Sequence, residues 1–303
     1  MKKITNNLFL GFIVPNIIIL GIIGINRALI GPSRGGVLVF SEFVILPVLM
    51  GIISAWFWKA LNLRTKVRIW YSILNGFIAI ALSFIFLGEG TICLIIVSPL
   101  IFTFVTTGAF IGKAMFTRNN QRFNVSFVSL LMLVFIVDTV SDHDYENLVS
   151  DQIIIKASPA KIWPNVVAFE QINDPNRYWL FKIGMPSPSK TTVTAHKNGA
   201  GRKCIFSNGY TFDEKIVAFD INKDLTFDII AQPQDPEIMG HIDIIRGQFL
   251  LKDNGDGTTT LIGNSWYKLK VFPIWYYDLW AESVTRNVHL RVMDHIKVLS
   301  EKK

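Results

Sequence analysis

Charged residues are scarce in this sequence. Asp, Glu, Lys and Arg make up 17% of the 303 residues, whereas soluble domains contain about a quarter. Half of the residues are hydrophobic, and the mean hydropathy is +0.38. The shortage lies between Leu8 and Val140; from Ser141 onward, charged and apolar residues are mixed. The composition excludes a chain that is soluble throughout, and it predicts a multi-span membrane domain over 1–145 and a soluble domain over 146–303.

Cysteine is scarce too, with two residues in the chain. Cys93 lies in an apolar stretch and Cys204 in a predicted strand, so we expect no disulfide between them. Their spacing matches no metal site, and His289 and His295 are six residues apart, hence on different faces of a helix. We therefore expect no metal and no cofactor.

Several enzyme motifs are missing from the chain. It has no nucleophile elbow, phosphate-binding loop, dinucleotide fingerprint or zinc-protease helix. An enzyme that works through the shape of a cavity and a few polar groups is not excluded by these absences.

The net charge of +7 is as large as that of many nucleic-acid-binding proteins, but the basic residues are not distributed as in such proteins. Many of the Lys and Arg residues lie in short loops between apolar stretches, where basic residues determine membrane topology. A basic patch or stripe on one face would be needed for a nucleic-acid footprint. We expect no nucleic-acid partner.

Five apolar stretches approach the roughly 20 residues that a membrane-spanning helix needs. They are Leu8–Ile25, Val37–Trp58, Ile69–Leu87, Thr91–Gly112 and Val125–Val140. The third and fourth are separated by Gly88-Glu89-Gly90, which predicts a tight hairpin. The first stretch could be a cleaved signal peptide, but no small-residue cleavage pattern follows it, and we favour an uncleaved helix.

The basic residues between these stretches predict the orientation. Arg27 and Arg34 lie on one side, and the other side holds nine: Lys2, Lys3, Lys59, Arg64, Lys66, Arg68, Lys113, Arg118 and Arg122. The positive-inside rule then places the N-terminus in the cytoplasm. We expect an integral protein of a bacterial cell membrane whose soluble domain is extracytoplasmic; one miscounted helix would reverse the side.

Charged residues within the spans are few. Glu42 and Asp138 each lie near the end of a span, where an interfacial position is the plainest interpretation. No internal repeat suggests a transporter. We interpret the membrane half as an anchor, or as a bundle that binds a membrane-protein partner.

The second half changes to short runs that are typical of strands. A first strand is expected at Asp151–Lys156, and Ser158-Pro159 is a good helix start. Turn residues such as Asn198-Gly199 and Asn208-Gly209 separate the later strands. These are Thr191–Lys197, Arg202–Ser207, Tyr210–Asp220, Asp224–Ala231, His241–Lys252 and Thr258–Val271.

A long amphipathic helix closes the chain, from Pro273 to about Ser300. Its apolar residues recur at three- and four-residue steps: Tyr277, Ala281, Val284, Val288, Val292, Ile296 and Leu299. The predicted fold class is thus an α-helical membrane bundle followed by an α+β domain, a curved antiparallel sheet around one long helix. An apolar cleft between sheet and helix is where a small molecule would bind.

Several segments of the second half resemble one superfamily. They are Ile155–Trp163, Phe206–Gly209 leading into Phe212–Ile216, Gly247–Leu251, Gly257–Thr259, Trp266-Tyr267 and the helix His289–Lys297. In order and spacing they are similar to the START-like, polyketide cyclase/dehydrase (SRPBCC) superfamily, which has the helix-grip fold. The resemblance covers about residues 150–300. It implies a domain that holds a lipid or another hydrophobic small molecule, in a superfamily that ranges from carriers to cyclases and hydrolases.

Strand alternation selects candidate site residues, provided that no bulge shifts the register. Glu214 lies on an otherwise apolar face, where it would read a ligand or transfer a proton; alternatively it pairs with a basic side chain or meets solvent. Glu214 and Tyr267 are the candidate catalytic residues. The expected ligand-binding residues are Phe206, Phe212, Ile216, Phe249, Leu251, Ser265, Tyr277, Trp280, Val284 and Val288. His289 is a weaker candidate because it borders the apolar face of its helix.

An aromatic cluster begins the closing helix: Trp275, Tyr276, Tyr277 and Trp280. These rings would pack in the core and line the cleft, or some of them would touch the membrane interface, where Trp and Tyr are favoured. Contact with the interface would place the mouth of the cleft next to lipid.

Three functions follow as hypotheses. The favoured one is membrane-tethered binding of a lipid or other hydrophobic small molecule. The second is a cyclase/dehydrase- or hydrolase-type enzyme acting on such a molecule. The third is a ligand-sensing regulatory or assembly protein whose helices contact a membrane partner.

Overall fold

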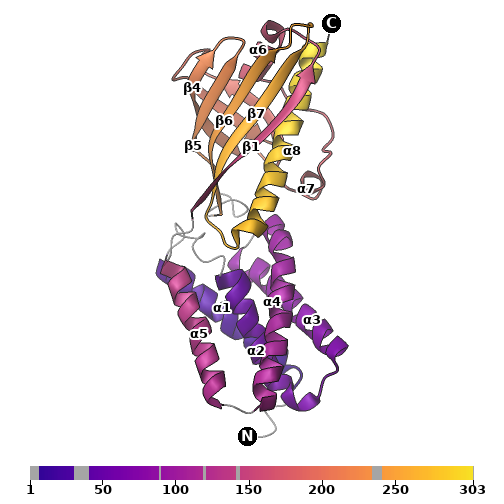
Figure 1. Ribbon diagram of the computed structural model, residues 1–303, viewed down its shortest axis with the longest axis vertical. Helices are drawn as coiled ribbons and strands as arrows, with labels where there is room; N and C mark the ends of the chain where they lie inside the picture. The colour runs from indigo at the N-terminus through magenta and orange to yellow at the C-terminus, as the bar shows by residue number, and fades with distance from the viewer. Residues whose placement is uncertain are drawn as a thin grey trace. The chain divides into compact units, whose positions relative to one another are not determined.

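The computed structural model describes residues 7–30, 41–88, 90–118, 121–140, 144–233 and 241–302. They divide into two compact units, which we describe separately. The first contains helices only, and the second contains an antiparallel sheet with a long C-terminal helix (Figure 1).

Each apolar stretch of the first unit forms a helix. The elements are α1 (Leu10–Ile30), a π-helical turn η2 (Ser41–Ile45), α2 (Leu46–Trp58), a 3₁₀ turn η3 (Lys59–Leu61), α3 (Thr65–Leu87), α4 (Thr91–Arg118) and α5 (Gln121–Val140). Three segments are long and apolar enough to cross a membrane: Glu42–Leu61, Thr65–Leu87 and Thr91–Thr117. The apolar parts of α1 and α5 are shorter, Leu10–Ile25 and Val125–Val134. A total of five spans therefore stays a prediction.

Part of the predicted topology falls on residues outside the described ones. Gly88 ends α3 with φ +67°, a left-handed conformation that suits glycine at a helix end. Glu89 of the expected hairpin, Lys2, Lys3 and Arg34 lie outside the described residues, as do the side chains of Arg27, Arg118, Arg122 and Asp138.

Helices α2 and α4 pack closely through glycines. A Cβ added to Gly108 would lie 2.1 Å from the carbonyl oxygen of Val48, and one added to Gly51 would lie 2.1 Å from that of Val105. The backbones therefore meet with no room for a side chain between them. Small residues at such contacts are typical of helix pairs in membranes.

A buried amide network joins α1, α2 and α3. The Asn16 side-chain amide donates to Asn75 Oδ1 (2.6 Å), and the Asn75 amide donates to Ser54 Oγ (2.8 Å). All three side chains are buried. Hydrogen bonds between polar side chains are a recurring source of helix association in apolar surroundings.

Seven antiparallel strands form the sheet of the second unit, in the order β1-β7-β6-β5-β4-β3-β2. They are β1 (Tyr145–Ile155), β2 (Pro188–Val193), β3 (Gly201–Phe206), β4 (Thr211–Asp220), β5 (Asp224–Ala231), β6 (Ile242–Asp253) and β7 (Thr259–Leu269). The predicted strands are confirmed, with shifted ends. β1 begins six residues before the expected Asp151, because it pairs with β7 along its whole length.

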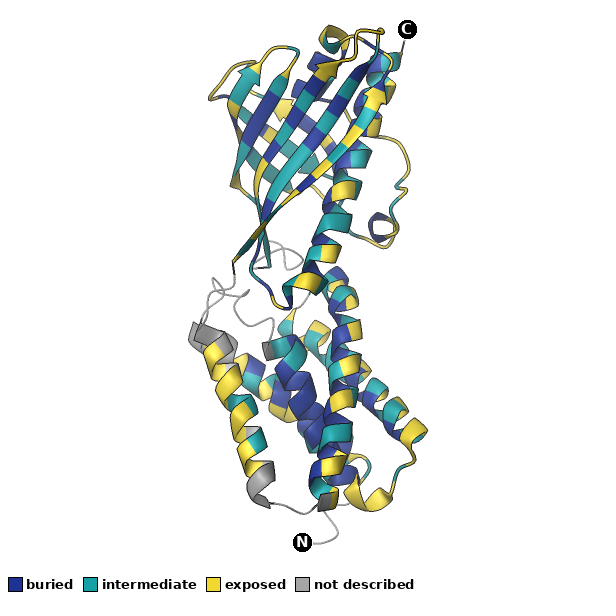
Figure 2. Cartoon of the chain, viewed as in Figure 1, coloured by how far each residue is buried: buried dark blue, intermediate teal, exposed yellow. Residues whose placement is uncertain are grey.

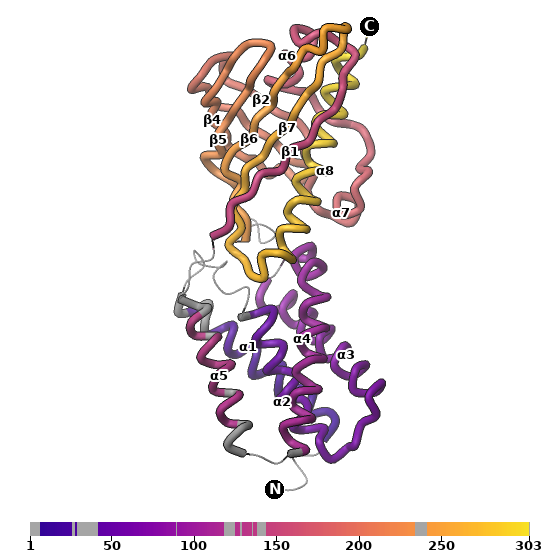
Figure 3. The backbone as a smooth tube through the Cα atoms, in the orientation of Figure 1, coloured from indigo at the N-terminus to yellow at the C-terminus, as the bar shows by residue number. Residues whose placement is uncertain are grey.

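The sheet curves around the C-terminal helix α8 (Ile274–Glu301) (Figures 1 and 3). α8 contacts β1 and β7 at one edge and β2 at the other, so both edges of the sheet reach the same helix. Two short helices complete the unit, α6 (Pro159–Val167) and α7 (Trp179–Lys182). This is the predicted helix-grip arrangement.

The core of this unit lies between the sheet, α6 and the second half of α8. Figure 2 shows buried positions alternating with more exposed ones along the strands. From α8 the core takes Val292, Met293 and Ile296, and from the sheet it includes Ile216, Leu225, Phe227, Phe249, Leu251 and Leu261. The core therefore takes residues from the C-terminal part of α8, and the candidate site lies beside the first half and the middle of the helix.

Candidate functional site

The buried face of α8 is rotated relative to the predicted one. His289, which we expected to border the apolar face, is only 5% exposed, and Thr285 and Met293 are buried with it. Val284 and Val288, expected at the centre, are half-buried at the side of that face. The expectation for His289 was wrong because polar side chains that have buried partners can lie on a core face.

Ser265, His289 and Asp151 form a chain of hydrogen bonds. Ser265 Oγ lies 2.7 Å from His289 Nε2, and His289 Nδ1 lies 2.9 Å from Asp151 Oδ2. The Asp151 carboxylate can only accept, so Nδ1 carries the proton and donates it. Nε2 of a neutral His289 is then the acceptor, and the Ser265 hydroxyl donates to it.

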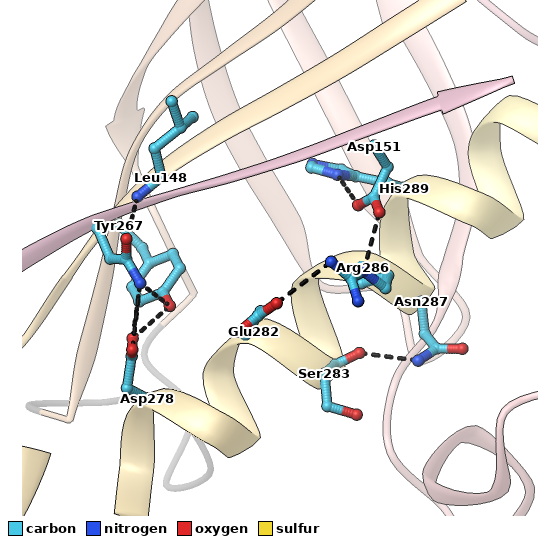
Figure 4. A network of polar contacts seen from close by, with 10 residues as sticks. Leu148, Asp151, Tyr267, Asp278, Glu282, Ser283, Arg286, Asn287 and His289 are labelled. Carbon is cyan, nitrogen blue, oxygen red and sulfur yellow. Dashed lines mark hydrogen bonds and ion pairs between the residues drawn. The ribbon is translucent and has the colours of Figure 1, made fainter. Parts of the chain in front are cut away.

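Strands β1 and β7 and helix α8 bring these three side chains together. β1 and β7 are neighbours in the sheet, with Val149 opposite Ser265 and Asp151 opposite Gly263, and α8 lies across them. Figure 4 shows His289 and Arg286 of α8 reaching the same Asp151 carboxylate of β1. Arg286 Nε donates to Asp151 Oδ1 at 2.9 Å.

The surroundings of His289 favour its neutral form. Burial lowers the pKa of His289, and the Asp151 carboxylate opposes that shift only in part. The nearby Arg286 cation lowers the pKa further. A neutral imidazole that accepts from a serine and donates to a carboxylate can act as a general base.

A second polar cluster joins Asn147 to Tyr267 and Asp278, the last two of which are labelled in Figure 4. The Tyr267 hydroxyl donates to Asp278 Oδ1 at 2.6 Å, and the Asn147 amide donates to the same carboxylate at 2.9 Å. Burial and the Asp278 carboxylate raise the pKa of Tyr267 well above its usual value. Tyr267 is therefore a neutral donor that is already bonded, which is a structural role; its predicted catalytic role stays untested.

Glu214 lies on β4 in a buried ion pair with Arg202 of β3, away from the Ser265–His289–Asp151 chain. It contacts Arg202 NH1 through Oε2, and the Arg202 guanidinium lies 4.5 Å from the Phe227 ring centroid. Burial raises the pKa of Glu214, whereas the Arg202 cation opposes that shift. This is the alternative in which Glu214 pairs with a basic side chain. A Glu214→Gln variant would therefore disturb an ion pair. A loss of activity in that variant would not show that Glu214 transfers a proton.

A buried thiol lies beside this pair. Burial, and then the Glu214 carboxylate, raise the pKa of Cys204 to about 12. A reactive cysteine requires a thiolate. The Cys204 side chain is therefore a thiol and not a thiolate at neutral pH.

The predicted ligand-binding residues separate into two groups. Ile216, Phe249 and Leu251 belong to the packed core and contribute to folding. Tyr277 is buried on α8. The others are half-buried beside the first half of α8 or at the starts and ends of the facing strands: Phe206, Phe212, Ser265, Trp280, Val284 and Val288.

Aromatic rings gather among the half-buried residues. The rings of Phe206 and Phe212 lie 5.2 Å apart, and those of Trp179 and Trp280 lie 6.3 Å apart. Tyr178 OH meets Ser283 Oγ at 3.1 Å, which ties the segment before α7 to α8. This segment was missed from the sequence because α7 has only four residues.

Sequence reasoning also missed Asp151, Arg202 and Asp278. A signal for Asp151 existed, because it shares the period-two face of β1 with Asn147, Val149 and Ile153. No group of three His, Cys, Asp or Glu side chains arranged for a metal occurs among the residues that the structure describes.

Comparison with known proteins finds solved structures that resemble the second half of the chain in fold. No protein-family model and no curated protein matches the chain. A solved Nitrosospira multiformis protein is 14% identical, covering 50% of this chain and 94% of its own (TM-score 0.35). Truncated norcoclaurine synthase from Thalictrum flavum is 12% identical, covering 54% and 98% (TM-score 0.38). Ara h 8.0201 is 14% identical, covering 52% and 98% (TM-score 0.35). Likenesses this distant establish neither chemistry nor ligand.

Proposed function

We propose that the second unit binds a lipid or another hydrophobic small molecule between the sheet and the first half of α8. The observation that supports this most is the contrast along α8. Its C-terminal part contributes Val292, Met293 and Ile296 to a core, whereas Trp280 and Val284 of its first half and Val288 at its midpoint remain half-buried. Covering such apolar surface contributes about 25 cal/mol per Å².

Polar groups beside these side chains would orient the ligand. Ser265 is half-buried, and its hydroxyl is held by His289. A few fixed polar groups in an apolar surrounding are typical of small-molecule sites. Ser265 Oγ, whose proton is donated to His289, would therefore accept a hydrogen bond from a hydroxyl group on an otherwise apolar molecule.

The first unit would hold this domain at a membrane. The segments Glu42–Leu61, Thr65–Leu87 and Thr91–Thr117 have the length and apolarity of membrane spans, and we extend this to five spans with a cytoplasmic N-terminus. At the start of α8, Trp275 is 67% exposed and Leu279 is also exposed. An interfacial position for these residues would allow an apolar ligand to enter from lipid. A protein partner for the helices stays a prediction.

Native mass spectrometry of the full chain, solubilised in detergent and exposed to a membrane lipid extract, tests the proposal. Val288→Trp would fill the site beside α8, and Val298→Trp is the matched control, because Val298 lies on the same helix and is 48% exposed. We expect a retained apolar adduct that Val288→Trp abolishes and Val298→Trp preserves. A folded chain with no adduct, or an adduct that both variants retain equally, would overturn the proposal.

Gly263 is unsuitable as the filled position, although it shares the inner face of β7. A Cβ at Gly263 would lie 2.9 Å from Met293 Sδ. A large side chain there would displace the core and would test stability instead of binding.

A second candidate function is hydrolysis of an ester, which the Ser265–His289–Asp151 chain favours. Ser265 Oγ would attack the carbonyl carbon while its proton passes to His289 Nε2. His289 would return that proton to the leaving alcohol, and Asp151 would stabilise the transient imidazolium. Water activated by His289 would then cleave the acyl-serine and restore the hydroxyl.

Binding ranks above hydrolysis because of the position of Ser265 within the sheet. β7 has ladder partners on both sides, Val149 of β1 and Gly247 of β6 at this level. Its amides therefore bond within the sheet and cannot form an oxyanion hole, which usually supplies a large part of such catalysis.

A fluorophosphonate probe separates the two functions. An activated Ser265 would form an Oγ–P bond with loss of fluoride, and the hydroxyl proton would pass to His289. Labelling that disappears in Ser265→Ala and His289→Gln but persists in Ser283→Ala would establish hydrolytic competence. Absence of labelling in a chain that retains an apolar adduct would leave binding as the function.

A further inference from the structure

A recess in the first unit is lined by three cations from three elements. It has a volume of about 380 Å³ and lies where α2 ends, α3 begins and α4 ends. Lys59 of η3, Arg68 of α3 and Lys113 of α4 line it, together with Asn62 and Thr117. Among the residues that the structure describes, none of the lining side chains is acidic.

Arg68 is the unusual member of this set. Its side chain is 3% exposed, and its Nε has no hydrogen-bond acceptor among the residues that the structure describes. Buried charged donors are normally paired, because leaving one unpaired has a large free-energy cost. Lys59 and Lys113 are exposed and add positive charge to the same recess.

From this arrangement we infer that the recess binds a phosphate group, carried by an anionic lipid or by a soluble phosphate compound. A guanidinium presents a planar set of donors that fits phosphate oxygens, and ammonium groups add point charges. The Asn62 amide can donate as well. The inference is independent of ligand binding by the second unit.

The lining also contains apolar groups that suit the lipid source. Ala55 and Phe116 line the recess beside the cations. Among the described residues, Glu42–Leu61, Thr65–Leu87 and Thr91–Thr117 are long and apolar enough to cross a membrane, so their ends lie at headgroup depth if they do cross it. Basic residues between helix ends are a recurring way of binding anionic headgroups.

Native mass spectrometry of the detergent-solubilised full chain provides the test. The probes are phosphatidylglycerol, phosphatidylcholine with the same acyl chains, and inorganic phosphate. Arg68→Gln and Lys113→Gln remove cations from the recess, and Lys66→Gln is the matched control, an exposed residue of α3 that does not line it. Lys113 is exposed, so Lys113→Gln should fold normally. It therefore still tests the inference if Arg68→Gln fails to fold. Each measurement is repeated with Val288→Trp to exclude lipid held by the second unit.

We expect phosphatidylglycerol to be retained over phosphatidylcholine, and retention to fall at least about tenfold in Arg68→Gln and Lys113→Gln. Lys66→Gln should change it less than about twofold. Retention of inorganic phosphate but not of phosphatidylglycerol, with the same pattern among variants, would assign the site to a soluble phosphate. Equal retention of both lipids, equal effects of Lys66→Gln and Lys113→Gln, or no binding of any probe would overturn the inference.

Discussion

Arg202 and Glu214 form an ion pair that is almost wholly removed from solvent, with side chains 2% and 4% exposed. Neighbouring strands β3 and β4 place the two residues directly opposite each other. Arg202 Nε also donates to the Val167 carbonyl oxygen at 3.2 Å. The guanidinium is thereby held by a carboxylate, a carbonyl and the face of Phe227.

Removing one partner of this pair should destabilise the second unit strongly. Arg202→Met would leave the Glu214 carboxylate buried without its cation, and losses of about 3–5 kcal/mol are typical of such changes. The double variant Arg202→Met/Glu214→Leu buries no charge and should recover most of that loss. Urea unfolding of the full chain in detergent, followed by tryptophan fluorescence, measures both. A double variant no more stable than Arg202→Met would show that the pair itself carries the stability.

Stability should decrease as the pH falls through the usual pKa of histidine, near 6.5. Burial lowers the pKa of His289, so the unfolded chain binds a proton there before the folded chain does. The contribution of neutral His289 is thus fully present above pH 6.5 and is lost as the pH falls below it. The thermal midpoint of the full chain, recorded between pH 5.5 and 7.5, checks the direction.

The matched variant for this pH dependence is His289→Gln. This variant should reduce the slope of the thermal midpoint against pH. The part of the slope that is left should come from His295, whose pKa is also lowered, chiefly by burial. His295→Gln in the same series measures that remainder. If His289→Gln leaves the slope unchanged, His289 is not the group that titrates.

The contact between α2 and α4 should tolerate no side chain at Gly108. A Cβ at Gly108 would meet backbone atoms of Val48 within 2.1–2.9 Å, whereas one at Gly21 of α1 would meet nothing within 4 Å. Gly108→Leu should therefore separate the helices and lower the thermal midpoint in detergent, with Gly21→Leu as the matched control. Equal midpoints for the two variants would contradict the close approach of the backbones.

Period-two and helical patterns were sufficient to predict the architecture of the second unit. The inner face of β7, with Leu261, Gly263, Ser265 and Tyr267, is buried or half-buried as alternation predicts. Positive φ values at Gly199 and Gly209 lie in the turns that Asn198-Gly199 and Asn208-Gly209 predict. These features are local, because each depends on a few neighbouring residues.

The polar partners could not be predicted in the same way. Asp151 and His289 are 138 residues apart, and they meet only because β1 lies beside β7 and α8 crosses both. Arg202 reaches Glu214 across the β3–β4 strand pair, whose register places the two residues directly opposite each other. A buried polar residue looks like a surface residue in the sequence until its partner is known, and this is why the face of α8 was misplaced.

The hydroxyl of Tyr267 should contribute more stability than that of Tyr178, because their acceptors differ in charge. Tyr267 is buried and donates to the Asp278 carboxylate at 2.6 Å, whereas Tyr178 meets the neutral Ser283 hydroxyl at 3.1 Å. Hydrogen bonds to charged groups contribute about 1.5–3 kcal/mol and neutral ones about 0.5–1.5 kcal/mol. Urea unfolding of Tyr267→Phe and Tyr178→Phe should show this order. The reverse order would mean that Asn147, which also donates to Asp278, satisfies the carboxylate without Tyr267.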